Sequence, residues 1–246
     1  MKKTTWLLGT SFLVGTLLAT MLAAPVVADT NAGPGTANAN LSGNTDTMVS
    51  AGQPVFTAND AQSASAKSTA QFTVKAGQLT LVAVPNLNFG DVEAATIVNG
   101  GTQSLVDNTV DNGSSKGQSA FDGNNAGQLI VSDMRGTGKG WSLSTSMNPE
   151  FNSGDSKLGG LSLTLAATTG SNSFFGSNKA LELAGTNIGK TAKTVVSTND
   201  NTGVGDTTFN LNAATLNFPK ATNSIFKADV PYQSDVTWIL GATPTP

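Results

Sequence analysis

The stretch QLIVSDMRGTGKGWSLSTSM, residues 128–147, carries the pattern that decides the fold. On both sides of a glycine-rich turn, Gly136–Gly140, apolar and polar residues alternate as they do in half-buried β-strands. The period of two places four side chains on one face of the second run, namely Trp141, Leu143, Thr145 and Met147. We therefore predict a β-hairpin over this stretch, with that face in the core.

The same alternation recurs from about residue 71 to the C-terminal residues. It aligns apolar side chains in several runs: Phe72 and Val74; Leu79 and Leu81; Leu161, Leu163 and Leu165; Phe209 and Leu211; Leu216 and Phe218; Val236, Trp238 and Leu240. A second hairpin is predicted over residues 95–106, around Asn99-Gly100-Gly101. Turn residues are frequent, and no long helical pattern follows residue 70. These features predict an all-β fold: a single sandwich- or barrel-like domain of many short, mostly antiparallel strands.

The first residues have the pattern of a secretory leader. Lys2 and Lys3 precede an apolar stretch, and Val26 and Ala28 match the residues that commonly stand before a cleavage site. We therefore predict a signal peptide over residues 1–28. An uncleaved membrane anchor is the alternative.

Composition changes twice downstream of the leader. Residues 29–68 are rich in Ala, Asn, Thr, Ser and Gly and are predicted to be a flexible spacer, whereas residues 69–246 are predicted to form the folded domain. No second apolar run is long enough to span a bilayer, so we expect no membrane span after leader cleavage. There is no cysteine for a lipid anchor, and the closing GATPTP carries no sortase-type signal. We therefore expect any attachment to a cell to be non-covalent.

Missing residue types limit the chemistry. The chain contains no His and no Cys, which excludes a Ser-His-Asp triad, a Cys-His dyad and the usual zinc ligands. Residues 107–127 and 197–206 are rich in Asp and Asn but lack the spacing of an EF-hand loop. The formal charge is −3, or −5 without the two leader lysines, and this argues against nucleic-acid binding. We expect no enzymatic activity, no cofactor and no bound metal.

Two tryptophans follow the leader, and each stands two residues before a leucine. These are the pairs Trp141 with Leu143 and Trp238 with Leu240. Residues i and i+2 of a strand share a face, so each pair projects together. The pairs either pack in the core or form an exposed aromatic surface that stacks on sugar rings. Flanking apolar residues favour the core, and we hypothesise that the two pairs are neighbouring halves of one core.

These segments resemble the WxL domain, which is found at the C-terminus of exported surface proteins of low-GC Gram-positive bacteria. GWSLSTS (140–146) is similar to the first motif of that domain, and VTWILGATP (236–244) is similar to the second. LTLVAVPNLNFGDV (79–92) resembles its early strand and turn, and the whole resemblance covers about residues 69–246. One departure is that the second motif commonly reads Tyr-x-Ala-x-Leu-Thr-Trp-x-Leu, whereas Ser234 and Val236 stand at the intermediate positions here.

The resemblance implies a secreted cell-surface protein that attaches non-covalently to peptidoglycan of the Gram-positive wall. It also implies membrane-anchored companion proteins and other WxL proteins as partners. The alternative is a structural interaction subunit that binds companion proteins or host matrix and touches the wall only indirectly.

The candidate site residues are Trp141, Leu143, Trp238 and Leu240, either in the core or at the wall. Arg135, the only arginine, is a further candidate. Its guanidinium can clamp a carboxylate of a peptidoglycan stem peptide, or pair with Asp133 or a nearby loop acid, and the pairing is favoured.

Overall fold

The computed structural model describes residues 45–48, 54–56, 60–61, 63, 69–118, 120–174, 176–220 and 226–244. The chain divides into two units, Met1–Thr73 and Val74–Pro246. In the first unit, β1 (Thr45–Met48) and β2 (Pro54–Phe56) form an antiparallel pair. This pair lies within the predicted spacer. The predicted leader lies outside the described residues.

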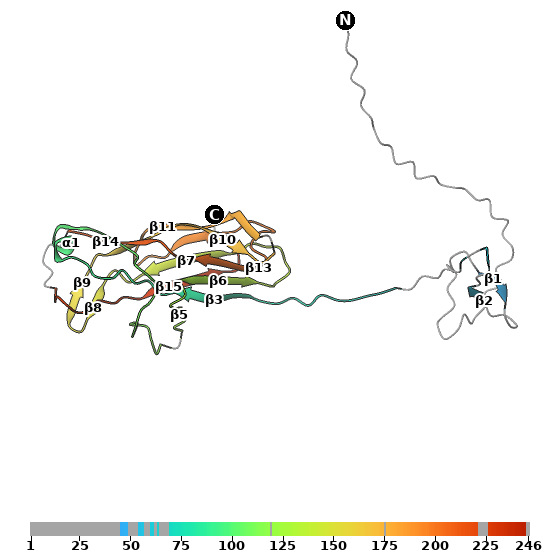
Figure 1. Cartoon of the computed structure of the whole chain (residues 1–246), viewed down its shortest axis with the longest axis horizontal. Helices are drawn as coiled ribbons and strands as arrows, with labels where there is room; N and C mark the ends of the chain where they lie inside the picture. Colours follow the sequence, from blue (N-terminus) through green and yellow to red (C-terminus); the bar gives the residue numbers. More distant parts are fainter. Residues whose placement is uncertain are drawn as a thin grey trace, which may run out of the picture. The chain divides into compact units, whose positions relative to one another are not determined.

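The second unit is built almost entirely of strands, which run along its long axis in Figure 1. They are β3 (Leu79–Pro85), β4 (Gly101–Ser104), β5 (Gly123–Asn124), β6 (Gln128–Asp133), β7 (Ser142–Met147), β8 (Phe151–Ser153), β9 (Ser156–Leu158), β10 (Ser162–Asn172), β11 (Gly176–Ile188), β12 (Lys193–Ser197), β13 (Gly205–Asn210), β14 (Ala214–Phe218) and β15 (Val236–Gly241). One short helix, α1 (Ala94–Asn99), accompanies them. The predicted all-β fold is confirmed.

These strands form two principal sheets. The larger follows the order β4-β14-β10-β13-β6-β3-β5, with β11 also paired to β10. The smaller is β12-β7-β15, and β8 with β9 forms a separate hairpin. All of these pairs are antiparallel except β3 with β5. The order leaves β15 at one edge of the smaller sheet.

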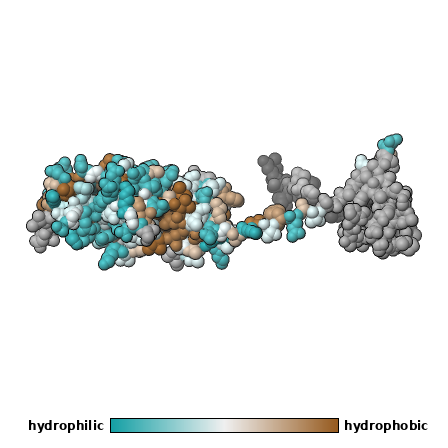
Figure 2. Space-filling model, turned by 90° about the horizontal axis from the view of Figure 1, so that it is seen from below, coloured by the Kyte–Doolittle hydropathy of each residue, from teal (hydrophilic) through white to brown (hydrophobic). Residues whose placement is uncertain are grey.

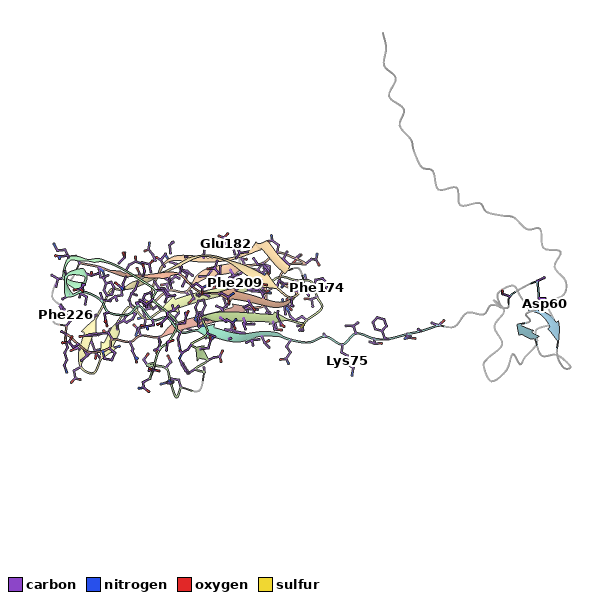
Figure 3. The ribbon with its side chains drawn as sticks, in the orientation of Figure 1. Asp60, Lys75, Phe174, Glu182, Phe209 and Phe226 are labelled. Carbon is purple, nitrogen blue, oxygen red and sulfur yellow. The ribbon has the colours of Figure 1, made fainter. Side chains whose placement is uncertain are left out.

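Alternate residues of the strands build the core. Leu129 and Val131 on β6, Leu163 and Leu165 on β10, and Phe209 on β13 are at most 2% exposed. Phe209 is seen inside the unit in Figure 3. Burying one such side chain completely contributes roughly 1.5–3 kcal/mol, so this core is the main source of stability. The period of two in the sequence therefore identifies most inward faces correctly. The predicted run of Phe72 and Val74 is wrong, because these side chains are 86% and 78% exposed and lie outside the strands.

The predicted hairpin over residues 128–147 is wrong. β6 pairs with β13 and β3, whereas β7 pairs with β12 and β15. The glycine-rich turn thus carries the chain from one sheet to the other. Alternation reports which face of a strand is buried, but a strand's partner depends on segments far away in the sequence.

The predicted hairpin over residues 95–106 is also wrong. Residues 94–99 form α1, and the next strand, β4, pairs with β14. Gly100 has a positive φ of 80° and ends the helix, so the Asn-Gly-Gly signal marks a helix terminus. A Cβ on Gly100 would lie 2.9 Å from the backbone nitrogen of Lys220, so glycine is required here.

Candidate functional site

Trp141 lies immediately before β7 and is fully buried. Its indole Nε1 donates a hydrogen bond to the carbonyl oxygen of Gly203 at 3.0 Å. Its backbone N–H donates to Thr198 Oγ1 at 2.6 Å, and the Thr198 N–H donates back to the Trp141 carbonyl oxygen at 2.9 Å. A buried tryptophan with a satisfied N–H supplies both a large apolar area and a fixed orientation. The ring of the first motif is therefore inside the core.

Two glycines allow the surrounding loops to approach this tryptophan. Gly203 has a φ of +76°, and a Cβ there would lie 2.4 Å from Trp141 Nε1. A Cβ on Gly140 would lie 2.3 Å from the carbonyl oxygen of Thr198. Distances this short cannot be accommodated beside backbone or a packed ring, so both positions require glycine.

Trp238 lies on β15 and is only half-buried, although it packs against the same core. Its strand pairs with β7 so that Leu240 lies opposite Leu143 and Trp238 lies opposite Thr145. The two motifs are therefore side by side on neighbouring strands. Among the described strands β15 is an edge strand, and the side chain of Trp238 remains partly exposed. The two tryptophans thus differ in their access to a ligand.

Arg135 is used within the fold. Its Nε and Nη2 donate to the two carboxylate oxygens of Asp133, both at 2.8 Å. Nη1 donates to the carbonyl oxygen of Ala242 at 2.6 Å, and Nη2 also donates to that of Lys139 at 2.7 Å. The guanidinium holds the pKa of the Asp133 carboxyl below its usual value, chiefly through its side-chain hydrogen bonds to that carboxylate. This geometry favours the pairing alternative over a role in holding a wall carboxylate.

A groove of about 1680 Å³ opens beside β3 and β15. Four described segments supply most of the lining, namely β3 with residues 86–97, residues 109–118 and 120–123, the β8–β9 hairpin, and residues 226–238. Buried side chains from β7, β10 and β14 also border it, among them Met147 and Leu163. Half-buried aromatic side chains contribute to its lining, namely Phe89, Phe121, Phe151, Phe226, Tyr232 and Trp238. Figure 2 views the unit from the side of β3 and shows hydrophobic side chains gathered in the middle of this face. The groove therefore has a partly aromatic lining and reaches inward to residues of the core.

The rim of the groove is acidic. Six exposed carboxylates belong to its lining, on Asp91, Glu93, Asp111, Asp122, Asp229 and Asp235. Lys227 is the single basic residue among the described lining residues. This imbalance disfavours a polyanionic ligand and favours one that is neutral or cationic.

Hydrogen bonds hold the walls of the groove in place. Asn124 Nδ2 donates to the carbonyl oxygen of Val84 at 2.6 Å, which ties β5 to β3. The hydroxyl groups of Ser114 and Ser115 both donate to the carboxylate of Asp235, which ties the loop 109–123 to the segment before β15. The walls are thus joined to each other and are not independent loops.

The family model described as "WxL domain surface cell wall-binding" matches residues 36–244. The chain belongs to the WxL-domain family. The resemblance predicted from the two motifs is thereby confirmed. No curated protein and no solved structure matches the chain.

The WxL match covers both tryptophan motifs and all four segments that line the groove. It begins at residue 36, within the predicted spacer, and so extends further towards the N-terminus than the predicted domain of residues 69–246. The antiparallel pair β1–β2 lies inside this additional matched region.

The Asp- and Asn-rich stretch at residues 107–127 begins with an ordinary turn. The carboxylate of Asp107 accepts hydrogen bonds from Asn88 Nδ2 at 2.9 Å and from the Thr109 N–H at 2.7 Å, as in an ordinary turn. Within the described parts of the chain, no cluster of three or more potential metal-ligating side chains is present. Among those same residues, no helix has the length and hydrophobicity of a membrane span.

Sequence reasoning missed the groove. The Asp- and Asn-rich composition of residues 107–127 is a signal, because Asp111 and Asp122 both lie on the rim. However, the opposing wall, residues 226–238, is more than a hundred residues away from Asp111. No local pattern connects the two.

Proposed function

We propose that this WxL-domain chain is exported and attaches non-covalently to the peptidoglycan of the cell wall. Membership of a surface cell-wall-binding family is the observation that carries the proposal. The leader pattern over residues 1–28 supports export. The family is one of binding domains, so the proposed role is attachment and not catalysis.

The groove is the surface that best suits this attachment. Its acidic rim repels the phosphate groups of anionic wall polymers, because like charges disfavour each other across a surface that water screens only partly. The sugars of peptidoglycan are uncharged, so its glycan strand meets no general repulsion at this rim. We therefore favour peptidoglycan over a phosphate-rich polymer as the wall component.

A second candidate is an interaction subunit that binds companion surface proteins or host matrix. The edge position of β15 is the observation that favours it. Ile239 on the outward face of β15 is 49% exposed, and Val82 on β3 is 51% exposed. An open strand edge with exposed apolar side chains can pair with a strand of another protein. In that case the chain would reach the wall through its partner.

Export and non-covalent attachment are tested together by intact-mass measurement. A chaotropic salt wash of intact cells should release the chain, because such salts weaken non-covalent contacts. We expect the mass of residues 29–246 with no attached wall fragment. A mass that retains residues 1–28 would show an anchored protein. Release only after enzymatic digestion of the wall would show covalent attachment, and either result would contradict the proposal.

A further inference from the structure

We propose that the groove beside β3 and β15 binds the sugar backbone of the wall as an extended chain of neutral N-acetylated amino sugars. This inference rests on the proposed function and names the surface and the part of peptidoglycan that it contacts. It follows from three properties of the groove: the aromatic lining, the carboxylates of the rim, and the size with its hydrogen-bonded walls.

The aromatic lining matches the apolar faces of sugar rings. Phe226, Tyr232 and Trp238 come from one segment of the chain, and Phe151 joins them from β8. Each is half-buried, so part of each side chain packs on the core while another part remains accessible. A pyranose ring presents a face of C–H groups, and burying that face against an aromatic ring removes apolar area from water.

The positions of two of these residues, Tyr232 and Trp238, are constrained by the fold. The hydroxyl oxygen of Tyr232 accepts a hydrogen bond from the backbone N–H of Lys227 at 2.7 Å, which sets the orientation of its ring. Trp238 is held by the pairing of β15 with β7. A ligand therefore has less to order at these two residues when it binds, and this lowers the entropic cost of binding.

The rim supplies hydrogen-bond acceptors for the polar edges of sugars. Asp91, Glu93 and Asp229 are exposed, and neither of the two ion pairs found in the described parts of the chain involves them. Sugar hydroxyl groups and acetamido N–H groups are donors, and hydrogen bonds to ionised carboxylates are among the stronger ones. The same carboxylates repel phosphate, which separates a neutral glycan from an anionic polymer.

The size of the groove leaves room for an oligomeric ligand. Pockets for single small molecules commonly have volumes of roughly 300–1,000 Å³. The groove exceeds this range at about 1680 Å³, although part of that space borders buried core residues such as Met147 and Leu163. A polymer that occupies several such positions gains contacts along its length without requiring any single strong contact. A cell-wall glycan is a polymer of this kind.

The test is calorimetric titration of the full chain, isolated from the cell surface, with the neutral tetramer of N-acetylglucosamine. We expect saturable binding to the unmodified chain. The double variant Asp91→Asn with Asp229→Asn should raise the Kd at least about tenfold. Asparagine keeps the shape of aspartate and tolerates the positive φ of 57° at position 229, so the fold should be preserved. Phe226→Ala should have a similar effect through the loss of a ring.

Two residues outside the groove lining provide matched controls. Phe174, which is 72% exposed, lies at the opposite end of the unit from Phe226 in Figure 3, and Phe174→Ala should leave the Kd unchanged. Glu182 is an exposed acid on β11, and Glu182→Gln should also have no effect. Melting midpoints of all variants show whether a loss of binding reflects a loss of fold.

Separate probes distinguish failure of the inference from failure of the proposed function. If the chain binds insoluble peptidoglycan but not the sugar tetramer, or binds soluble stem peptides instead, the glycan assignment is overturned while wall attachment stands. The same conclusion follows if the groove variants bind the tetramer as the unmodified chain does. If the chain binds no peptidoglycan preparation, the proposed function fails.

Discussion

Deletion of residues 237–246 is expected to prevent folding of the Val74–Pro246 unit. The deletion removes nearly all of β15, including Trp238 and Leu240, and leaves one edge of β7 without a partner. It also removes the carbonyl oxygen of Ala242 that accepts a hydrogen bond from Arg135. Trp238 is half-buried, so its loss costs less than the roughly 3–5 kcal/mol typical of a buried Trp, but the pairing with β7 is lost together with it. A domain has only about 5–15 kcal/mol of stability in total.

Circular dichroism and a thermal melt measure this effect. The truncated chain should lack a cooperative transition, whereas Phe174→Ala, a change at a side chain that is 72% exposed, should melt as the full chain does. A truncated chain with an unchanged cooperative melt would show that β15 is dispensable and that the core closes without it.

Substitution Trp141→Ala is expected to lower the free energy of unfolding by about 3–5 kcal/mol. The indole is fully buried, and its removal leaves both a cavity and an unpaired carbonyl oxygen on Gly203. Trp141→Phe keeps most of the ring area but loses the hydrogen bond, so its cost should be about 1–2 kcal/mol.

Chemical denaturation of these variants gives the required free energies. Phe174→Ala is a suitable control because this exposed side chain should change stability by less than about 0.5 kcal/mol. If Trp141→Ala were as stable as the unmodified chain but bound peptidoglycan less well, the ring would act on the ligand and not in the core.

The inward faces of the strands can be predicted from the sequence because they depend on local alternation. The period of two assigns Leu143, Met147, Leu163 and Phe209 to buried faces, and each is at most 1% exposed. Strand partners cannot be predicted in the same way. The turn after β6 has the composition of a hairpin turn, and only the distant strands β13 and β12 draw β6 and β7 into different sheets.

The difference between the two tryptophans also depends on long-range structure. Locally, Trp141 and Trp238 stand in the same three-residue pattern. β7, however, lies between β12 and β15, whereas among the strands that the structure describes β15 has a partner on one side only. The first tryptophan is therefore enclosed, and the second lines the groove.

The candidate site also depends on contacts between residues that lie far apart in the sequence. The pairing of Arg135 with Asp133 can be anticipated because the two residues are two positions apart. The contact of Arg135 with Ala242 cannot, since more than a hundred residues separate them. The groove is formed by segments that lie far apart in the sequence. The composition of residues 107–127 therefore marks acids of its rim, but no local pattern reveals the groove itself.

The central claim is that this WxL domain itself attaches to the wall. Co-sedimentation of the purified chain with peptidoglycan, stripped of proteins and of anionic polymers, tests this most directly. We expect saturable binding that persists without any companion protein and that is weakened by the double variant Asp91→Asn with Asp229→Asn. If the chain stays in the supernatant at every peptidoglycan concentration and sediments only when companion surface proteins are added, the claim of direct attachment is contradicted.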